Sequence, residues 1–178
     1  MSQPITYNID PAHSTAGFKV RHLMVANVRG EFSKVTGTVV FDPDNPANTK
    51  IQASIDASTI HTRDEQRDAH LKSADFLHVE QHPTIDFVST KVSGSGDEWK
   101  VTGNLTIHGV TKEVVLDVEG PAAEAKDPWG GTRTGVSATT KINRKDFGLT
   151  WNAALETGGF VVGDELTLTL EIELIRAA

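Results

Sequence analysis

A strict alternation of apolar and polar residues near the C-terminus constrains the fold more than any other feature of the chain. Between residues 166 and 174, threonine and glutamate residues alternate with five aliphatic ones, Leu166, Leu168, Leu170, Ile172 and Leu174. Successive side chains of a β-strand point to opposite faces, so this period of two predicts a strand with one apolar and one polar face. A half-solvated antiparallel sheet has this pattern.

The same period recurs along the chain, in segments 51–57, 85–87, 101–107 and 114–118. Residues typical of turns lie between strand-like runs, at 42–46, 94–97, 108–109, 127–131 and 163–164. Short links join antiparallel neighbours. No linker or repeat divides the chain. We therefore predict an all-β protein in which residues 1–178 form one domain of about eight antiparallel strands, either a sandwich or a closed barrel.

Small residues on the apolar parity favour a hollow barrel over a filled sandwich core. They are Ala16, Ala53, Ala57, Gly103 and Ala138. One strand also changes parity, because Phe32 lies on an even position and Val35 on an odd one. An extra residue near Ser33 and Lys34, as in a β-bulge, would restore the faces.

Composition and charge exclude several classes of function. The chain has no cysteine, which rules out disulfides, thiolate metal sites and thiol nucleophiles. Its net charge of −7 opposes nonspecific binding to nucleic acid or to anionic membrane surfaces. No segment reaches the roughly 20 apolar residues of a membrane span, and residues 1–6 have no signal-peptide character. The sequence as it stands predicts a cytoplasmic protein, and a periplasmic one if a leader has been removed.

A charged segment with four histidines, His61, His70, His78 and His82, interrupts the strands. Thr62 and Glu65 have the spacing of a capping box, and no glycine, proline or β-branched residue follows before residue 74. We predict a short helical lid over residues 63–77 that packs on one end of the sheet. His78 and His82, with His70, Asp68 and Asp75 nearby, are alternatively zinc or iron ligands.

Two further histidines invite a functional reading. His22 shares even parity with Phe18, Val20 and Met24, so it is either a hydrogen-bonded core group or a polar anchor in a pocket. His13 precedes Ser14, but adjacent strand residues point to opposite faces, which is unsuitable for a nucleophile and its base. The chain has no nucleotide-binding, hydrolase or metalloprotease motif, and we predict no enzyme activity.

Several motifs along the chain resemble the successive signatures of the YceI-like family. They include Asp10-Pro-Ala-His13-Ser14, Arg67-Asp68-Ala-His70-Leu71, Pro83-Thr-Ile-Asp-Phe87, Leu105-Thr-Ile-His-Gly109-Val-Thr111 and Arg144-Lys-Asp146-Phe147-Gly148. The resemblance runs in order from about Tyr7 to Ile175. It implies a lipocalin-like barrel with a helical lid that binds a long isoprenoid lipid or quinone tail, without a cofactor. It is also compatible with a homodimer, and many members of the family carry a secretion signal.

Parity and lid position together give a set of candidate ligand-binding residues. These are Phe18, Val20, His22, Met24, Phe32, Phe41, Leu71, Phe76, Leu77, Ile85, Phe87, Leu105, Ile107, Ile142, Arg144, Phe147, Trp151, Leu168 and Leu170. Arg144 either holds a polar lipid head group at the cavity mouth or pairs with Asp146 or another carboxylate and fixes its loop. Two classes of function remain open: a lipid carrier or store, and a metal-dependent enzyme or stress protein that uses segment 61–82.

Overall fold

The computed structural model describes residues 2–156, 159 and 161–178, which form one antiparallel sheet and a single α-helix. No helix in this part of the chain is long and apolar enough to cross a membrane. The strands are β1 (Ile5–Ile9), β2 (Thr15–His22), β3 (Ala26–Phe32), β4 (Val35–Phe41), β5 (Lys50–Asp56), β6 (Ile60–His61), β7 (Thr84–Ser95), β8 (Glu98–Ile107), β9 (Val110–Glu119), β10 (Ala125–Lys126), β11 (Thr132–Asn143) and β12 (Val162–Arg176). The helix is α1 (Glu65–Lys72), and four 3-10 turns are η1 (Pro11–His13), η2 (Pro46–Asn48), η3 (Ala57–Thr59) and η4 (Arg144–Phe147).

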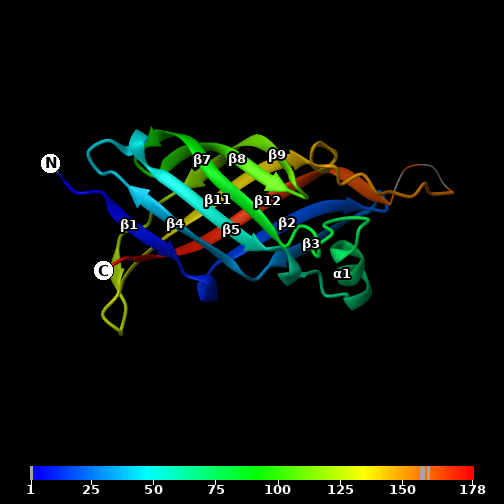
Figure 1. Cartoon of the computed structure of the whole chain (residues 1–178), viewed down its shortest axis with the longest axis horizontal. Helices are drawn as coiled ribbons and strands as arrows, with labels where there is room; N and C mark the ends of the chain where they lie inside the picture. Colours follow the sequence, from blue (N-terminus) through cyan, green and yellow to red (C-terminus); the bar gives the residue numbers. More distant parts are fainter. Residues whose placement is uncertain (1, 157–158, 160) are drawn as a thin grey trace.

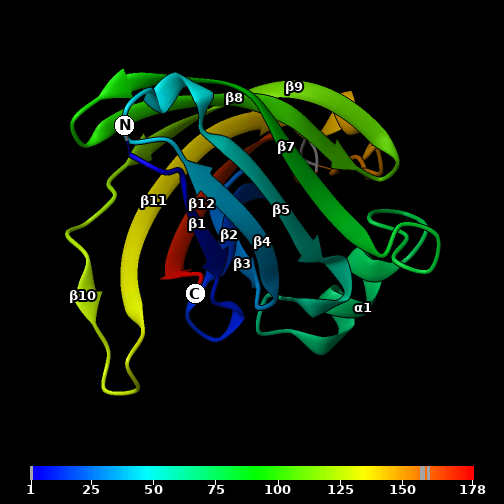
Figure 2. The same cartoon turned by 60° about the vertical axis from the view of Figure 1, so that its left-hand side comes forward.

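Eight of the strands close into a barrel. The ring runs β1-β4-β5-β7-β8-β9-β11-β12, and it closes because β12 pairs with β11 on one edge and with β1 on the other (Figure 2). Every pair is antiparallel, as the short links between strands predict. The barrel prediction is therefore confirmed, and the sandwich alternative is wrong.

Strand β12 organises the barrel. One of its edges pairs with β11 over residues 165–175, and the other is shared between β1, at residues 174–176, and β2, at residues 162–171. Beyond β2 lie β3 and then β6, which continue the sheet along this edge of β12. Because β12 begins at Val162, the turn expected at 163–164 is wrong: Gly163 and Asp164 lie within the strand, where its register with β2 shifts.

The β-bulge expected within one strand near Ser33 and Lys34 is wrong, because the change of parity falls at a break between two strands, β3 and β4, that pair with different neighbours. Phe32 ends β3, Val35 begins β4, and both side chains are buried. The two intervening residues therefore let an even-numbered and an odd-numbered residue face the same interior. The small inward residues have two uses. Ala16, Ala53 and Ala138 line a cavity, whereas at Gly103 a Cβ atom would lie 2.4 Å from the Phe87 ring, so that glycine makes room for an aromatic side chain.

The lid helix is shorter than predicted and is capped by a different residue. Asp64 is the N-cap, and its carboxylate accepts hydrogen bonds from the backbone N–H groups of Gln66 and Arg67. The capping box expected between Thr62 and Glu65 is wrong, because the Thr62 hydroxyl donates to Asp68 at 2.6 Å. Helix α1 spans only 65–72, and the remainder of the expected lid continues as turns. It lies at the end of the barrel opposite the two chain termini (Figure 1).

Candidate ligand-binding cavity

An apolar cavity of about 280 Å³ lies inside the barrel. Its wall is formed by the inward-facing side chains of the strands, among them the alternating leucines of β12. Several of these, such as Leu168, remain half-exposed although they face the interior, because a void rather than another side chain lies beside them. The alternation in the sequence therefore produces a hollow, and the small residues Ala16, Ala53 and Ala138 widen it.

Most of the predicted ligand-binding residues lie on this wall. They are Phe18, Val20, Phe32, Leu71, Phe76, Leu77, Ile85, Phe87, Leu105, Ile107, Ile142, Arg144, Leu168 and Leu170. Aliphatic residues that the prediction omitted also contribute, including Ile51, Ile55, Val101, Val114 and Leu116. The signal that could have found them is the same period of two, since each lies on the apolar parity of its own strand.

Five predicted residues lie off the wall. His22 is the last residue of β2, and Met24 lies in the following turn, where the parity of the strand no longer applies. Phe41 ends β4 and packs on the core, while Phe147 is only 1 % exposed within it. Trp151 lies outside the cavity and packs against the lid. These five residues therefore do not line the cavity.

The polar groups on the wall are bonded within the protein. Thr140 donates its hydroxyl to the carbonyl of Val115 at 2.9 Å, and Asp86 accepts from the hydroxyl of Thr84 at 2.8 Å. Arg144 is the third polar residue of the wall. A ligand in the cavity therefore meets hydrocarbon along most of its length.

Arg144 is buried and binds backbone carbonyl groups. Its Nε donates to Gly163 at 2.7 Å, its Nη1 to Leu149 and Trp151 at 2.6 and 2.9 Å, and its Nη2 to Val162 at 3.4 Å. Burial lowers the pKa of the guanidinium. The nearest carboxylate is that of Asp164, 3.7 Å away, and not that of Asp146. This geometry favours the loop-fixing role over the head-group role, because few N–H groups are left to bind a ligand.

The lid closes the end of the cavity with apolar side chains. Leu71 of α1 and Phe76 and Leu77 just beyond it reach the cavity wall. The Phe76 ring packs against Trp151, with ring centroids 5.3 Å apart, and His70 lies edge-on to both rings. Arg67 anchors the start of the helix by donating to the hydroxyl and the carbonyl of Thr62. Anchored at its start and held elsewhere by apolar contacts, the lid is a candidate gate.

The histidines of segment 61–82 do not come together as a metal-binding site in the structure. His61 contacts Glu31 at 3.2 Å and His70 contacts Asp75 at 2.8 Å, while Asp68 accepts from Thr62. His82 lies beside His108 of the β8–β9 turn, with ring centroids 4.9 Å apart, and burial lowers the pKa of His108. Within the described residues, no group from this segment brings three ligand atoms within 4.8 Å of one another.

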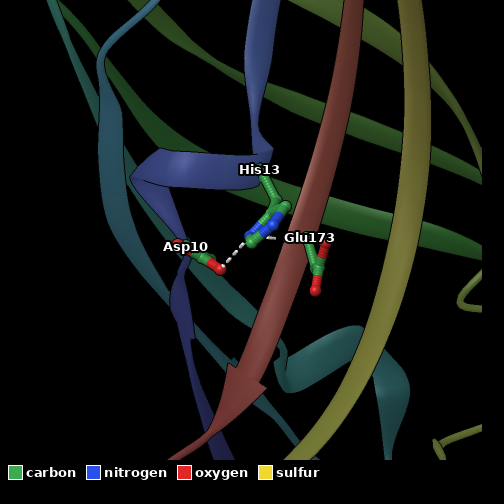
Figure 3. Close-up of side chains that lie close together, drawn as sticks. All are labelled: Asp10, His13 and Glu173. Carbon is green, nitrogen blue, oxygen red and sulfur yellow. Dashed lines mark hydrogen bonds and ion pairs between the residues drawn. The ribbon is translucent and has the colours of Figure 1, made fainter. Parts of the chain in front are cut away.

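One group elsewhere does meet that distance: Asp10, His13 and Glu173 (Figure 3). His13 Nδ1 lies 2.7 Å from Asp10 Oδ2. Arg133 Nη1 already donates to the same Asp10 oxygen at 2.6 Å and to Glu173 at 2.9 Å. The guanidinium thus supplies the positive charge that the two carboxylates require, so the cluster is an ion-pair network.

This network lowers the pKa of two carboxyl groups, those of Asp10 and Asp127. The hydrogen bond from His13, followed by that from Arg133, lowers the pKa of Asp10 from 3.8 to about 2. Arg133 also lowers the pKa of Asp127, to which its Nε donates at 2.7 Å. The hydrogen bond to Asp10 raises the pKa of His13. Ser14 is buried and bonds to the backbone of Glu173, so His13 and Ser14 do not form a nucleophile and base.

Comparison with known proteins agrees with this architecture. The family model for the YceI-like domain matches residues 7–174. The protein YceI of Salmonella newport is 41% identical over 146 residues, which cover 81% of this chain and 76% of the relative. The YceI protein of Campylobacter jejuni has a similar structure, with a TM-score of 0.71, 31% identity, and coverage of 89% of this chain and 90% of the other.

A more distant structure shares the fold alone. A polyisoprenoid-binding domain from Saccharophagus degradans superposes with a TM-score of 0.69 at 15% identity, covering 96% of this chain and 98% of that domain.

Proposed function

The chain belongs to the YceI-like family, and from that premise we propose that it binds a long-chain isoprenoid lipid, such as a polyprenyl diphosphate or a quinone, and carries or stores it. The cavity inside the barrel is the binding site. No catalytic step is part of this proposal.

The observation that carries the proposal is the apolar wall along the barrel. β12 alone has 15 residues, which at about 3.3 Å per residue make it roughly 50 Å long. An extended hydrocarbon chain can use such a wall throughout its length. A compact polar metabolite would leave most of it uncovered, and it would find the polar groups of the wall already bonded.

The chemistry of the ligand restricts where it comes from. Burial of a methylene group contributes about 0.8 kcal/mol relative to water, so about 25 such groups would reach the ceiling of measured affinities. A lipid of this length is not free in water at useful concentration. It must therefore move between the cavity and a membrane, a micelle or another protein, and access to the cavity should limit the rate of exchange.

We infer that the lid moves to admit a long lipid, because the cavity is small. Its volume of about 280 Å³ lies just below the range of roughly 300–1,000 Å³ of typical ligand pockets. A long chain would need more room than that. Displacing Leu71 and Phe76 is the simplest way to provide it, because the lid is held to the barrel largely by apolar contacts.

Organic extraction of the purified protein followed by mass spectrometry tests the proposal. We expect a long-chain isoprenoid lipid in wild type and its loss in Leu170→Glu, which places a charge on the cavity wall. Thr169→Glu is the matched control, because the neighbouring side chain faces outward and is exposed. Equal lipid content in a folded Leu170→Glu variant and in the control would refute the cavity as the site.

Trp151 reports on the lid. In a variant with Trp99 and Trp129 replaced by Phe, the fluorescence of the remaining Trp151 should change when lipid displaces Phe76 from its ring. Phe76→Ala should speed exchange of a fluorescent lipid analogue by about tenfold, because one apolar contact of about 1–2 kcal/mol is lost. An unchanged exchange rate would show that the lid does not gate the cavity.

A further inference from the structure

The turn between β2 and β3 exposes three consecutive apolar side chains. Leu23 is 41%, Met24 55% and Val25 76% exposed. We call residues 23–25 the hairpin tip. Single exposed apolar residues are common on protein surfaces, but a run of three at a protruding turn is a feature of interaction sites.

The backbone of the hairpin tip is also unfavourable for these residues. Leu23 has φ 53° and Met24 has φ 63°, and Val25 N–H donates to the His22 carbonyl at 3.2 Å. These two residues are therefore the central pair of a turn with left-handed geometry, where asparagine and glycine are preferred. Bulky side chains in this conformation cost stability. Neither the left-handed backbone at these residues nor their exposed apolar surface stabilises the barrel. Both therefore point to a role other than folding.

Basic residues flank the hairpin tip on the outward face of the hairpin. They are Lys19, Arg21 and Arg29, and none of them forms an ion pair among the described residues. Lys19 lies directly opposite Arg29, an arrangement that is itself unfavourable. The neighbouring acidic residues have partners of their own: Glu31 contacts His61, Asp164 contacts Lys145, and Glu165 contacts Lys141. This local positive charge contrasts with the net charge of −7 of the chain.

The hairpin tip adjoins the cavity. Phe18 and Val20, on the inward face of β2, line the cavity wall, and His22 pairs with the wall residue Val162. Leu23 N–H donates to the Val161 carbonyl at 2.8 Å. The hairpin tip projects at the same end of the barrel as the lid helix α1 (Figure 1).

We propose that the hairpin tip inserts into the interfacial region of an anionic phospholipid bilayer, with Lys19, Arg21 and Arg29 against the lipid phosphates. Apolar side chains that enter the acyl boundary and basic side chains that remain at the head groups are the two components of peripheral membrane binding. Docking in this way brings the lid end of the cavity to the membrane. The proposal goes beyond lipid binding in the cavity and does not depend on which lipid fills it.

Vesicle co-sedimentation with Leu23→Asn/Met24→Gly tests the apolar part. The probes are vesicles of phosphatidylcholine with and without phosphatidylglycerol. Wild type should bind the anionic vesicles, and the variant should bind them about tenfold more weakly or worse. Its Tm should not fall, because asparagine and glycine suit the turn. Trp129→Ser is the matched control: Trp129 is 81% exposed but lies in the β10–β11 turn (Figure 2), so its loss should leave vesicle binding unchanged.

Two further measurements test the charge and the insertion. Lys19→Gln/Arg29→Gln should weaken binding to the anionic vesicles only, and added salt should do the same in wild type. Val25→Trp should gain emission that lipids with brominated acyl chains quench, above the signal of wild type. The proposal is overturned if wild type does not bind anionic vesicles, or if the turn variant binds them like wild type. It is also overturned if neutralising the two basic residues leaves binding unchanged. The same holds if Val25→Trp shows no added quenching, as expected when the hairpin tip is buried in a dimer.

Discussion

Two arginines at opposite ends of β11 hold the barrel by different chemistry. Arg133, near the start of the strand, binds the carboxylates of Asp10, Asp127 and Glu173. Arg144, directly after its end, binds backbone carbonyl groups of the segment 149–163. The carboxylates raise the pKa of Arg133, whereas burial lowers that of Arg144. The Arg133 network therefore responds to pH through its partners, while the carbonyl groups that Arg144 binds do not titrate.

The difference matters for the function that we propose. The segment held by Arg144 supplies Trp151, on which the lid packs, and leads into Val162 of the cavity wall. A fixed, pH-independent support on this side leaves the lid as the moving part. The Arg133 network instead ties η1 and β12 to the β10–β11 hairpin, away from the lid.

The largest effect is expected from Arg144→Met. Removing the guanidinium leaves the carbonyl groups of Leu149, Trp151 and Gly163, which are buried or partly buried, without this donor, so the free energy of unfolding should fall by about 3–5 kcal/mol. The loss should be the same between pH 5 and pH 8 because the hydrogen-bond partners of Arg144 are carbonyl groups, which do not titrate. Urea denaturation at several pH values measures both the size of this loss and its dependence on pH. Arg144→Lys should recover little, since a single ammonium group cannot reach carbonyls on several sides. A strongly pH-dependent loss would break the contrast between the two arginines.

Arg133→Met should destabilise the protein less than Arg144→Met, and the loss of stability should depend strongly on pH. Without the guanidinium, Asp10 loses one of the hydrogen bonds that lower its pKa, so this pKa should move back toward 3.8. A carboxyl group whose pKa is lowered on folding stabilises the protein above its unfolded pKa, and this stabilisation is lost as pH falls through the folded pKa. The Tm of the variant should therefore lie furthest below that of wild type at pH 7, and the two values should converge as pH falls toward 2. Parallel pH profiles for the two proteins would contradict the network.

The cavity wall could be predicted from the sequence because it depends on a local pattern. Leu168, Leu170 and Phe87 face inward because their strands alternate, and no distant residue can change that. The prediction fails at Met24, where the alternation was extended past the end of β2 at His22. Parity has no meaning beyond the last strand residue.

The two arginine sites could not be predicted in this way. Arg133 and Asp10 are 123 residues apart, and neither residue carries a local signal of the other. For Arg144 both roles were open, because its partners are carbonyl groups, which every residue has. Only the positions of the carbonyl groups of residues 149, 151, 162 and 163 decide between the two roles, and hydrophobic periodicity contains no information about those positions.

Asp10→Asn tests the pH dependence of the Arg133 network at acid pH. The pKa of Asp10 is about 2 in the folded protein against 3.8 unfolded, so its contribution to stability is fully present above about pH 4 and is lost as pH falls toward 2. The variant should be less stable than wild type at pH 7 by about 2 kcal/mol or less, since part of the ion-pair energy is screened by water. The difference should close near pH 2, as acid titration followed by circular dichroism can show. A difference that persists at pH 2 would mean that Asp10 acts through packing alone.

His13→Gln should have the smallest effect and the opposite dependence on pH. The hydrogen bond to Asp10 raises the pKa of His13 above 6.5, so the stabilisation from the charged imidazole is fully present below that value and is lost as pH rises through the raised pKa. Because the side chain is 58% exposed, the Tm of the variant should fall below that of wild type by only about 1–2 °C at pH 5.5. The two proteins should melt together at pH 9. Arg144→Met, measured beside them, should show the same loss at both pH values. If His13→Gln lowered the Tm equally at pH 5.5 and pH 9, its hydrogen bond to Asp10 would not depend on charge, and the ion-pair network would reduce to Arg133 and its carboxylates.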